Sequence, residues 1–176
     1  MASATARDQV ILDIGCGTGS TLRFLKSRGY ENLHGLEISN YAVRRLQGEG
    51  ITMHLGALPR IPLPDSSVDA IIASQVLEHV VRRRRLLTEI RRVLRPGGQA
   101  FVFVPDNCLG PIDEPEHVMK YSAESLRKFL RAYLHVAEIY SFRDLTKSMP
   151  ILFARAQKIA NASGAMFSPP AARMGK

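Results

Sequence analysis

Three glycines at alternate positions constrain this chain more than any other feature of its sequence. Gly15, Gly17 and Gly19 follow an apolar run that Asp13 interrupts, and residues 18–27 after them have helical spacing. A strand, a glycine loop and a helix in this order bring backbone amides and the positive end of a helix dipole to one point. Glycines there also remove side chains that would keep a ligand from the main chain. We therefore interpret this stretch as a ligand-binding unit rather than an ordinary glycine-rich turn.

The length and composition predict one globular domain. The chain has 176 residues, of which 45% are apolar, so it can bury a substantial core and is not a disordered chain. We expect a single domain over residues 1–160 and a flexible tail over residues 161–176, where Ala, Ser, Pro and Gly follow one another without periodicity. No apolar run approaches the roughly 20 residues that a bilayer span needs, and the N-terminus does not look like a secretory signal.

Cysteine usage and charge limit the compartment and the partners. Cys16 lies in the glycine loop, where a disulfide would be disruptive, so we expect Cys16 and Cys108 to be reduced thiols and the protein to be cytoplasmic. The net charge of +8 permits binding to nucleic acid but does not indicate it. The densest charge, Arg82 to Arg85, has no aromatic residues among it, so a solvated helix face is the favoured interpretation. The oligomeric state is not readable from the sequence.

Strand-like and helix-like segments alternate along the first hundred residues. We expect strands at 9–14, 33–37, 51–55, 68–74 and 100–104, and helices at 18–27, 40–47 and 82–94. Strands that are apolar on both faces, separated by helices, predict a parallel sheet covered on both sides. A further helix is expected from Ser122 to about Arg131, followed by strands at 136–142 and 151–156. The short connection between these last two strands predicts an antiparallel pair at the end of the sheet.

Several polar or small residues fall at the carboxyl ends of the predicted strands, where an open parallel sheet binds its ligands. These are Asp13, Gly15 to Gly19, Glu37, Ala57, Leu58 and Ser74. A carboxylate at Glu37 can accept hydrogen bonds from both hydroxyls of a ribose, although an exposed charged strand end is the plainer alternative. The third glycine comes one residue too early for a dinucleotide loop, and no lysine follows as in a P-loop. Asp13 at the head of the loop therefore favours a ligand that carries a cation over a polyphosphate.

Several ordered motifs together resemble the class I S-adenosylmethionine-dependent methyltransferases, and among them the methyltransferase type 11/12 group. The motifs are Leu12-Asp13-Ile14-Gly15-Cys16-Gly17-Thr18-Gly19, Gly35-Leu36-Glu37-Ile38-Ser39, Leu63-Pro64-Asp65-Ser66-Ser67-Val68-Asp69, Leu77-Glu78-His79-Val80 and Val93-Leu94-Arg95-Pro96-Gly97-Gly98. The resemblance covers residues 10–142. It implies a Rossmann-like three-layer α/β/α sandwich with a mostly parallel seven-stranded sheet, whose last strand is antiparallel and lies between strands five and six.

The resemblance also implies site roles and a cofactor, S-adenosylmethionine, which leaves as S-adenosylhomocysteine. The loop residues Gly15, Cys16, Gly17 and Gly19 would lie against the methionine part of the cofactor, with Asp13 helping to hold it. Glu37 would bind the ribose, Ile38 would pack on the adenine, and Ser74 and Gln75 would lie near the methyl group.

The chain departs from the family at two places. The family usually has Gly-Asp after strand three, where this chain has Gly56-Ala57. The backbone of Ala57 and Leu58, together with packing, would hold the adenine, so we expect weaker or altered cofactor affinity. The family also carries helices before strand one, whereas about eight residues precede it here. In the family these helices cap the cofactor and shape the substrate pocket, so we expect either that this lid is missing or that the chain is a fragment or a minimal member of the family.

Methyl transfer needs a general base only where the acceptor must lose a proton. His79 and His117 are the candidates, and a structural role for His79, capping the next helix or bonding a backbone carbonyl, is an equal alternative. We expect no metal site. The resulting prediction is an enzyme that methylates a small molecule. Methylation of RNA or protein, and a non-catalytic binding protein with this fold, are the alternatives.

Overall fold

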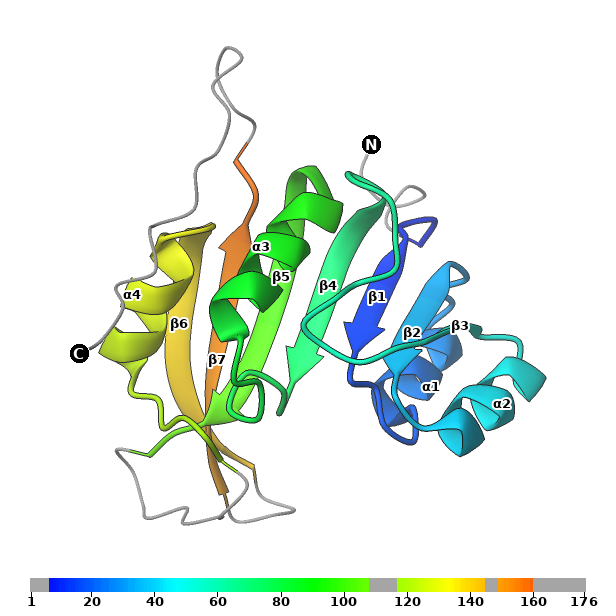
Figure 1. Cartoon of the computed structure of the whole chain (residues 1–176), viewed down its shortest axis with the longest axis horizontal. Coiled ribbons are helices and arrows are strands. Elements are labelled where there is room, and N and C mark those ends of the chain that lie inside the picture. The colour runs from blue at the N-terminus through cyan, green and yellow to red at the C-terminus, as the bar shows by residue number, and fades with distance from the viewer. Residues whose placement is uncertain (1–6, 108–116, 145–148, 160–176) are drawn as a thin grey trace.

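The computed structural model describes residues 7–107, 117–144 and 149–159, so the expectations for Cys108 and for the tail lie outside the described residues. Strands and helices alternate along the first half of the chain and give way to two strands at its end (Figure 1). The elements are β1 (Ile11–Ile14), α1 (Ser20–Ser27), β2 (Leu33–Glu37), α2 (Asn40–Gly48), β3 (Thr52–Leu55), β4 (Val68–Ser74), α3 (Arg83–Val93), β5 (Leu94–Pro105), α4 (Ala123–Arg131), β6 (His135–Asp144) and β7 (Met149–Gln157).

All seven strands form one sheet in the order β3-β2-β1-β4-β5-β7-β6. The first five are parallel, and β7 is antiparallel to both β5 and β6. The predicted sheet, including the antiparallel strand between strands five and six, is confirmed. Ile14 of β1 pairs with Leu36 of β2 on one side and with Ala73 of β4 on the other. The carboxyl ends of β1, β2 and β4 therefore meet at one edge, and the chain reverses its direction of travel across the sheet there.

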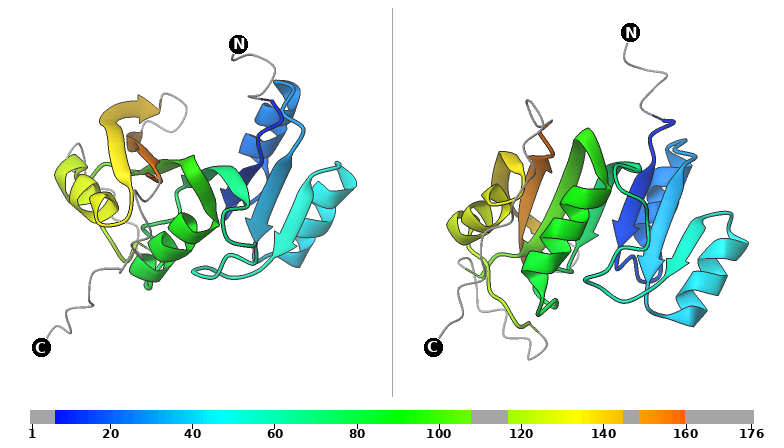
Figure 2. Two further views of the ribbon diagram at one scale, coloured as in Figure 1. Left: turned by 90° about the horizontal axis from the view of Figure 1, so that it is seen from above. Right: turned by 45° about the horizontal axis from the view of Figure 1, so that its top comes forward.

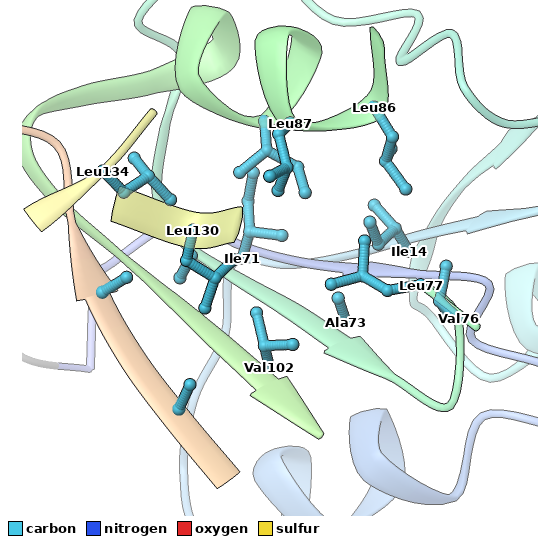
Figure 3. Packing of buried hydrophobic residues seen from close by; sticks show 14 of the residues in the cluster. Ile14, Ile71, Ala73, Val76, Leu77, Leu86, Leu87, Val102, Leu130 and Leu134 are labelled. Carbon is cyan, nitrogen blue, oxygen red and sulfur yellow. The ribbon is translucent and has the colours of Figure 1, made fainter. Parts of the chain in front are cut away.

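The helices α3 and α4 cover one face of the sheet. Figure 2 shows α3 on the side of the sheet opposite α1. The leucines of α3 and α4 are fully buried against alternate residues of β4, β5 and β7, as the core packing in Figure 3 shows. The polar face of α3 carries its arginines, so its amphipathic pattern fixes which side of the helix meets the sheet.

The helices α1 and α2 cover the other face over β1, β2 and β3, with Leu22, Val43 and Leu46 at the centre of this second cluster. The three-layer architecture is thereby confirmed. Over β5, β7 and β6 the same face carries a row of ring contacts that runs through Phe101, Phe103, Phe153, Tyr140 and Phe142. Phe101 packs against the edge of this second cluster, whereas Tyr140 and Phe142 remain 52% and 39% exposed.

The boundary between α3 and β5 differs from the sequence expectation. We expected Pro96-Gly97-Gly98 to separate a helix from a strand beginning near Ala100, but β5 begins at Leu94 and runs through these residues. Leu94 pairs with Val68, and the backbone of Gly97 and Gly98 exchanges two hydrogen bonds with Lys158 at 2.7 and 2.9 Å. Gly97 has a φ of +82°, so this segment is an irregular strand end that only looks like a turn in the sequence.

Candidate functional site

The glycine loop between β1 and α1 uses its three glycines for two different purposes. All three have positive φ, at +65° for Gly15, +53° for Gly17 and +82° for Gly19. A Cβ atom on Gly15 would lie 2.9 Å from the Val76 side chain, and one on Gly19 would overlap the Leu46 side chain. A Cβ on Gly17 would meet nothing within 4 Å. Gly15 and Gly19 thus permit close packing inside the protein, whereas Gly17 borders open space where a ligand can approach the backbone.

Glu37, the last residue of β2, is placed directly against this loop. One carboxylate oxygen accepts a hydrogen bond from the Gly17 amide at 3.0 Å. The other oxygen accepts from the amides of Ile38 at 2.9 Å and Ser39 at 3.0 Å. Three backbone donors therefore orient a half-buried carboxylate at the edge of the sheet. This arrangement leaves remaining acceptor capacity for hydroxyl groups of a ligand.

Asp13 lies in β1 and is only 3% exposed. Burial, together with the charge of nearby Glu37, raises the pKa of Asp13 to about 7. The same causes, with the charge of Asp13 added, raise the pKa of the Cys16 thiol to about 12. Two carboxylates close together in a partly dry site favour a positively charged ligand, because a cation would relieve their repulsion. Cys16 is a neutral thiol in this setting and not a nucleophile.

The segment after β3 is tied to the same edge. The Gly56 amide donates to the Glu37 carbonyl at 3.0 Å. Ala57 and Leu58 follow Gly56 directly; Ala57 is exposed and Leu58 packs partly against the core. Neither residue has a carboxylate, so they can offer only backbone hydrogen bonds. Ile38 follows Glu37 directly and is 69% exposed. An exposed isoleucine at this position provides an apolar surface for a flat ring.

Ser74 and Gln75 lie at the end of β4. Gln75 has a φ of +55°, unusual for a residue other than glycine, and its amide donates to the Phe103 carbonyl at 2.8 Å. Ser74 forms part of the wall of a cavity of about 490 Å³ between α1 and the sheet. Most of that wall is apolar and includes Thr21, Phe24, Ile72, Phe101 and Phe103. The cavity could hold a small molecule with an apolar body.

His79 and His117, far apart in the sequence, lie side by side. Their ring centroids are 4.9 Å apart and the rings meet edge to face. His79 does not cap the next helix, because the N-cap of α3 is Arg82. Its amide donates to the Val76 carbonyl at 3.1 Å, which makes a tight turn directly after β4. Sequence reasoning did not include Glu78, whose carboxylate belongs to the same group. The adjacent Glu-His pair in the Leu77-Glu78-His79-Val80 motif was the signal that could have found it.

The arginine-rich helix α3 is largely engaged within the protein. Arg92 donates to the carbonyls of Ile61 and Leu63, both at 2.8 Å, and to the carboxylates of Asp65 and Glu89. Arg91 donates to the Tyr133 carbonyl, and the Arg83 guanidinium lies 5.6 Å from the centre of the Phe129 ring. These contacts hold two parts of the chain in place, which are α4 and the proline-rich loop between β3 and β4 that contains Pro59, Pro62 and Pro64. A structural role accounts for these side chains without a nucleic-acid partner.

Comparison with known proteins points to one family. A family model described as "Methyltransferase domain" matches residues 12–102, which is just over half of the chain. A probable S-adenosylmethionine-dependent methyltransferase of Mycolicibacterium smegmatis is 32% identical over 128 residues, covering 68% of this chain and 49% of the relative. An O-methyltransferase of Aspergillus nomiae is 30% identical over 119 residues, covering 61% of this chain and 53% of the relative. The chain thus spans about half the length of these two relatives.

A solved structure shares the fold over most of the chain. It is the Burkholderia thailandensis 1,6-didemethyltoxoflavin-N1-methyltransferase with bound 1,6-didemethyltoxoflavin and S-adenosylhomocysteine. The TM-score is 0.73 at 16% identity, with 88% of this chain and 73% of that chain covered. In a separate respect, none of the helices in the described part of the chain combines the length and the apolar character needed to cross a membrane.

Proposed function

Because the chain belongs to the class I S-adenosylmethionine-dependent methyltransferases, we propose that it binds S-adenosylmethionine at the glycine loop and transfers its methyl group to a small-molecule acceptor. The observation that carries the proposal is the Glu37 carboxylate, oriented by three backbone amides beside the open face of Gly17. When bound, this cofactor supplies an already activated methyl group on a sulfonium.

The residues around the loop fit such a ligand by their chemistry. Glu37 offers acceptors for ribose hydroxyls, and the exposed Ile38 offers an apolar surface for adenine. The buried Asp13 favours a positive charge, which the methionine portion carries. Ala57 and Leu58 offer backbone groups and packing to the adenine edge. We infer from the missing carboxylate at Ala57 that the affinity depends more heavily on Glu37 than it would with an acid there.

The acceptor proposal rests on the apolar cavity beside Ser74 and on the relatives. A site of about 490 Å³ with aromatic walls suits a compact organic molecule. The Aspergillus relative is named as an O-methyltransferase, and the structural neighbour is an N1-methyltransferase with bound 1,6-didemethyltoxoflavin. Alignment and exclusion of water would supply much of the rate acceleration. A cytoplasmic location, expected from the cysteines, is part of the same proposal.

Isothermal titration calorimetry of the full chain with S-adenosylmethionine tests the proposal. We expect saturable 1:1 binding that Glu37→Gln weakens and that Glu138→Gln, a carboxylate change on β6, leaves unchanged. No binding at millimolar cofactor would overturn the enzyme proposal and favour a non-catalytic binding protein. Salt-dependent RNA binding that raises the release of S-adenosylhomocysteine would instead favour RNA methylation.

The two histidines are separable from cofactor binding. We propose His79 and His117 as the groups that act on the acceptor, near the end of β4. If each acts as a general base, His79→Ala and His117→Ala lower the rate of S-adenosylhomocysteine formation and keep the calorimetric affinity for the cofactor. Unchanged rates in both variants would exclude the base role.

A further inference from the structure

Three side chains of metal-ligating type converge just beyond the end of β4. Glu78, His79 and His117 each offer one ligand atom, and these atoms all lie within 4.8 Å of one another. We propose that this cluster binds a divalent transition-metal ion through one carboxylate oxygen and two imidazole nitrogens. The proposal departs from the expectation of no metal site that we drew from the sequence. His79 and His117 are 38 positions apart in the sequence, so no short ligand spacing indicates the site.

The fold explains why these groups meet. Val76 and Leu77 anchor the segment after β4 in the core, as Figure 3 shows, and Val76 packs on Gly15. The Met119 amide donates to the Glu78 carbonyl at 3.3 Å, which brings the segment containing His117 against this turn. The side chains of both segments are therefore placed by backbone contacts and core packing. An ion would not have to organise the site from a disordered state.

The burial of the three groups suits a site that is closed on the side of Glu78 and open to solvent on the side of His79. Glu78 is fully buried, His117 is half-buried and His79 is exposed. A buried carboxylate is costly unless a cation or hydrogen bonds compensate its charge. Two imidazoles and one carboxylate form the donor set of several catalytic zinc sites and of non-haem iron sites, in which positions remain open for water or substrate.

Tyr121 supplies a second observation at the same place. Its hydroxyl is buried and has no hydrogen-bond partner among the described residues. Tyr121 is 2% exposed and lies two residues after Met119, whose amide donates to the Glu78 carbonyl. A buried hydroxyl without a partner calls for an unseen one. Water on an ion held by Glu78 would supply it.

The cluster gives the two histidines a different role from that of bases. His79 lies in the turn directly after Ser74 and Gln75, and His117 lies beside it. This role rests on the proposed function, which places the transferred methyl group near Ser74 and Gln75. An ion held there would have open positions for an oxygen of the acceptor and would lower the pKa of that group. The class of acceptor this favours is one with a hydroxyl that can both bind a metal and lose a proton.

Cobalt binding is the test, because Co²⁺ accepts the same donors and reports its coordination by visible absorption. The full chain, stripped with a chelator, is titrated with CoCl₂, and ZnCl₂ is then added to displace the cobalt. We expect one saturable site whose spectrum shows nitrogen and oxygen ligation. His79→Ala and His117→Ala should each weaken the affinity by at least about tenfold, since the loss even of outer-shell partners has such effects.

Two histidine variants serve as controls. His135→Ala removes an exposed histidine on β6, and His54→Ala breaks the other close histidine pair, whose nitrogens lie 3.0 Å apart on β2 and β3. Both should bind cobalt as the unaltered chain does. Glu78→Gln is a further variant, and its folding is checked by circular dichroism because the residue is buried. Absence of saturable binding, or binding that survives in the His79→Ala/His117→Ala double variant, would overturn the proposal.

The metal proposal and the methyltransferase proposal fail separately. Calorimetry with S-adenosylmethionine in the presence of chelator reports the cofactor site alone. Cofactor binding without cobalt binding would leave the proposed function standing and remove the metal site. Cobalt binding without cofactor binding would do the reverse.

Discussion

The Glu37 carboxylate accepts a hydrogen bond from the Gly17 amide at 3.0 Å and so joins the end of β2 to the loop after β1. The contact connects the carboxyl ends of two neighbouring strands, of which β1 borders β4, where the strand order reverses. A ligand bound there touches both at once. It also makes Glu37 part of the geometry of the loop as well as a partner for the ligand.

We expect Glu37→Gln to weaken S-adenosylmethionine binding by about ten- to a hundredfold, because hydrogen bonds to a charged group contribute about 1.5–3 kcal/mol each. The measurement is calorimetric titration at constant salt. Glu138→Gln, which removes a carboxylate paired with Arg155, is the matched control. Equal affinities for Glu37→Gln and the unaltered chain would show that the ribose is bound elsewhere.

The pH dependence of cofactor binding should report Asp13. Its pKa is raised to about 7 in the free protein, so the side chain is neutral below that pH and ionised above it. A cationic ligand binds the ionised form better, so the affinity should increase as the pH rises towards 7, by up to about tenfold per pH unit, and level off above it. Asp13→Asn should flatten the profile. An affinity independent of pH in the unaltered chain would contradict this assignment.

The same group affects stability in the opposite direction. The folded state keeps a proton on Asp13 that the unfolded chain loses above its ordinary pKa of 3.8. The free energy of unfolding should therefore decrease as the pH rises from about 4 to 7, relative to Asp13→Asn. Urea unfolding of the two proteins across this range measures the difference. A parallel pH dependence in both would place the effect in other groups.

Substitutions in the glycine loop should separate folding from binding. Gly19→Ala forces a side chain into a left-handed position and against Leu46, and we expect it to cost about 2–4 kcal/mol of stability. Gly17→Ala meets no neighbour, so it should cost about 1 kcal/mol yet impair cofactor binding. Urea unfolding and calorimetry distinguish the two.

Gly48→Ala is the matched control for both, because Gly48 lies in α2 and has no atom near the added carbon. It should leave cofactor binding unchanged and raise stability by up to about 1 kcal/mol. A Gly17→Ala protein that binds the cofactor normally would show that the open face of the loop is not where the ligand lies.

Much of the fold was predictable because it depends on local signals. Val68–Ser74 is a mostly apolar run and Leu33–Glu37 is a short strand that ends in an acidic residue, and both have the predicted bounds. The helices predicted at 40–47 and from Ser122 begin where the side chains of Ser39 and Ser122 cap them. The prediction of a turn at Gly97 was wrong, because the Gly97 amide donates to the carbonyl of Lys158, some 60 residues away, within an irregular strand end. The approach of Glu78 to His117 was likewise hidden, because it depends on long-range contacts such as the hydrogen bond from the Met119 amide to the Glu78 carbonyl.

Among the arginines of α3, Arg92 should contribute most to the free energy of unfolding. Its planar guanidinium donates at once to two carbonyls of the proline-rich loop and to Glu89 and Asp65, a geometry that an ammonium cannot reproduce. We expect Arg92→Lys to lower the free energy of unfolding by about 1–3 kcal/mol, because buried carbonyls lose their donors. Arg44→Lys, an exposed change on α2, is the control and should have no effect. Equal stability of the two variants in urea would mean that the loop is held by its apolar contacts instead.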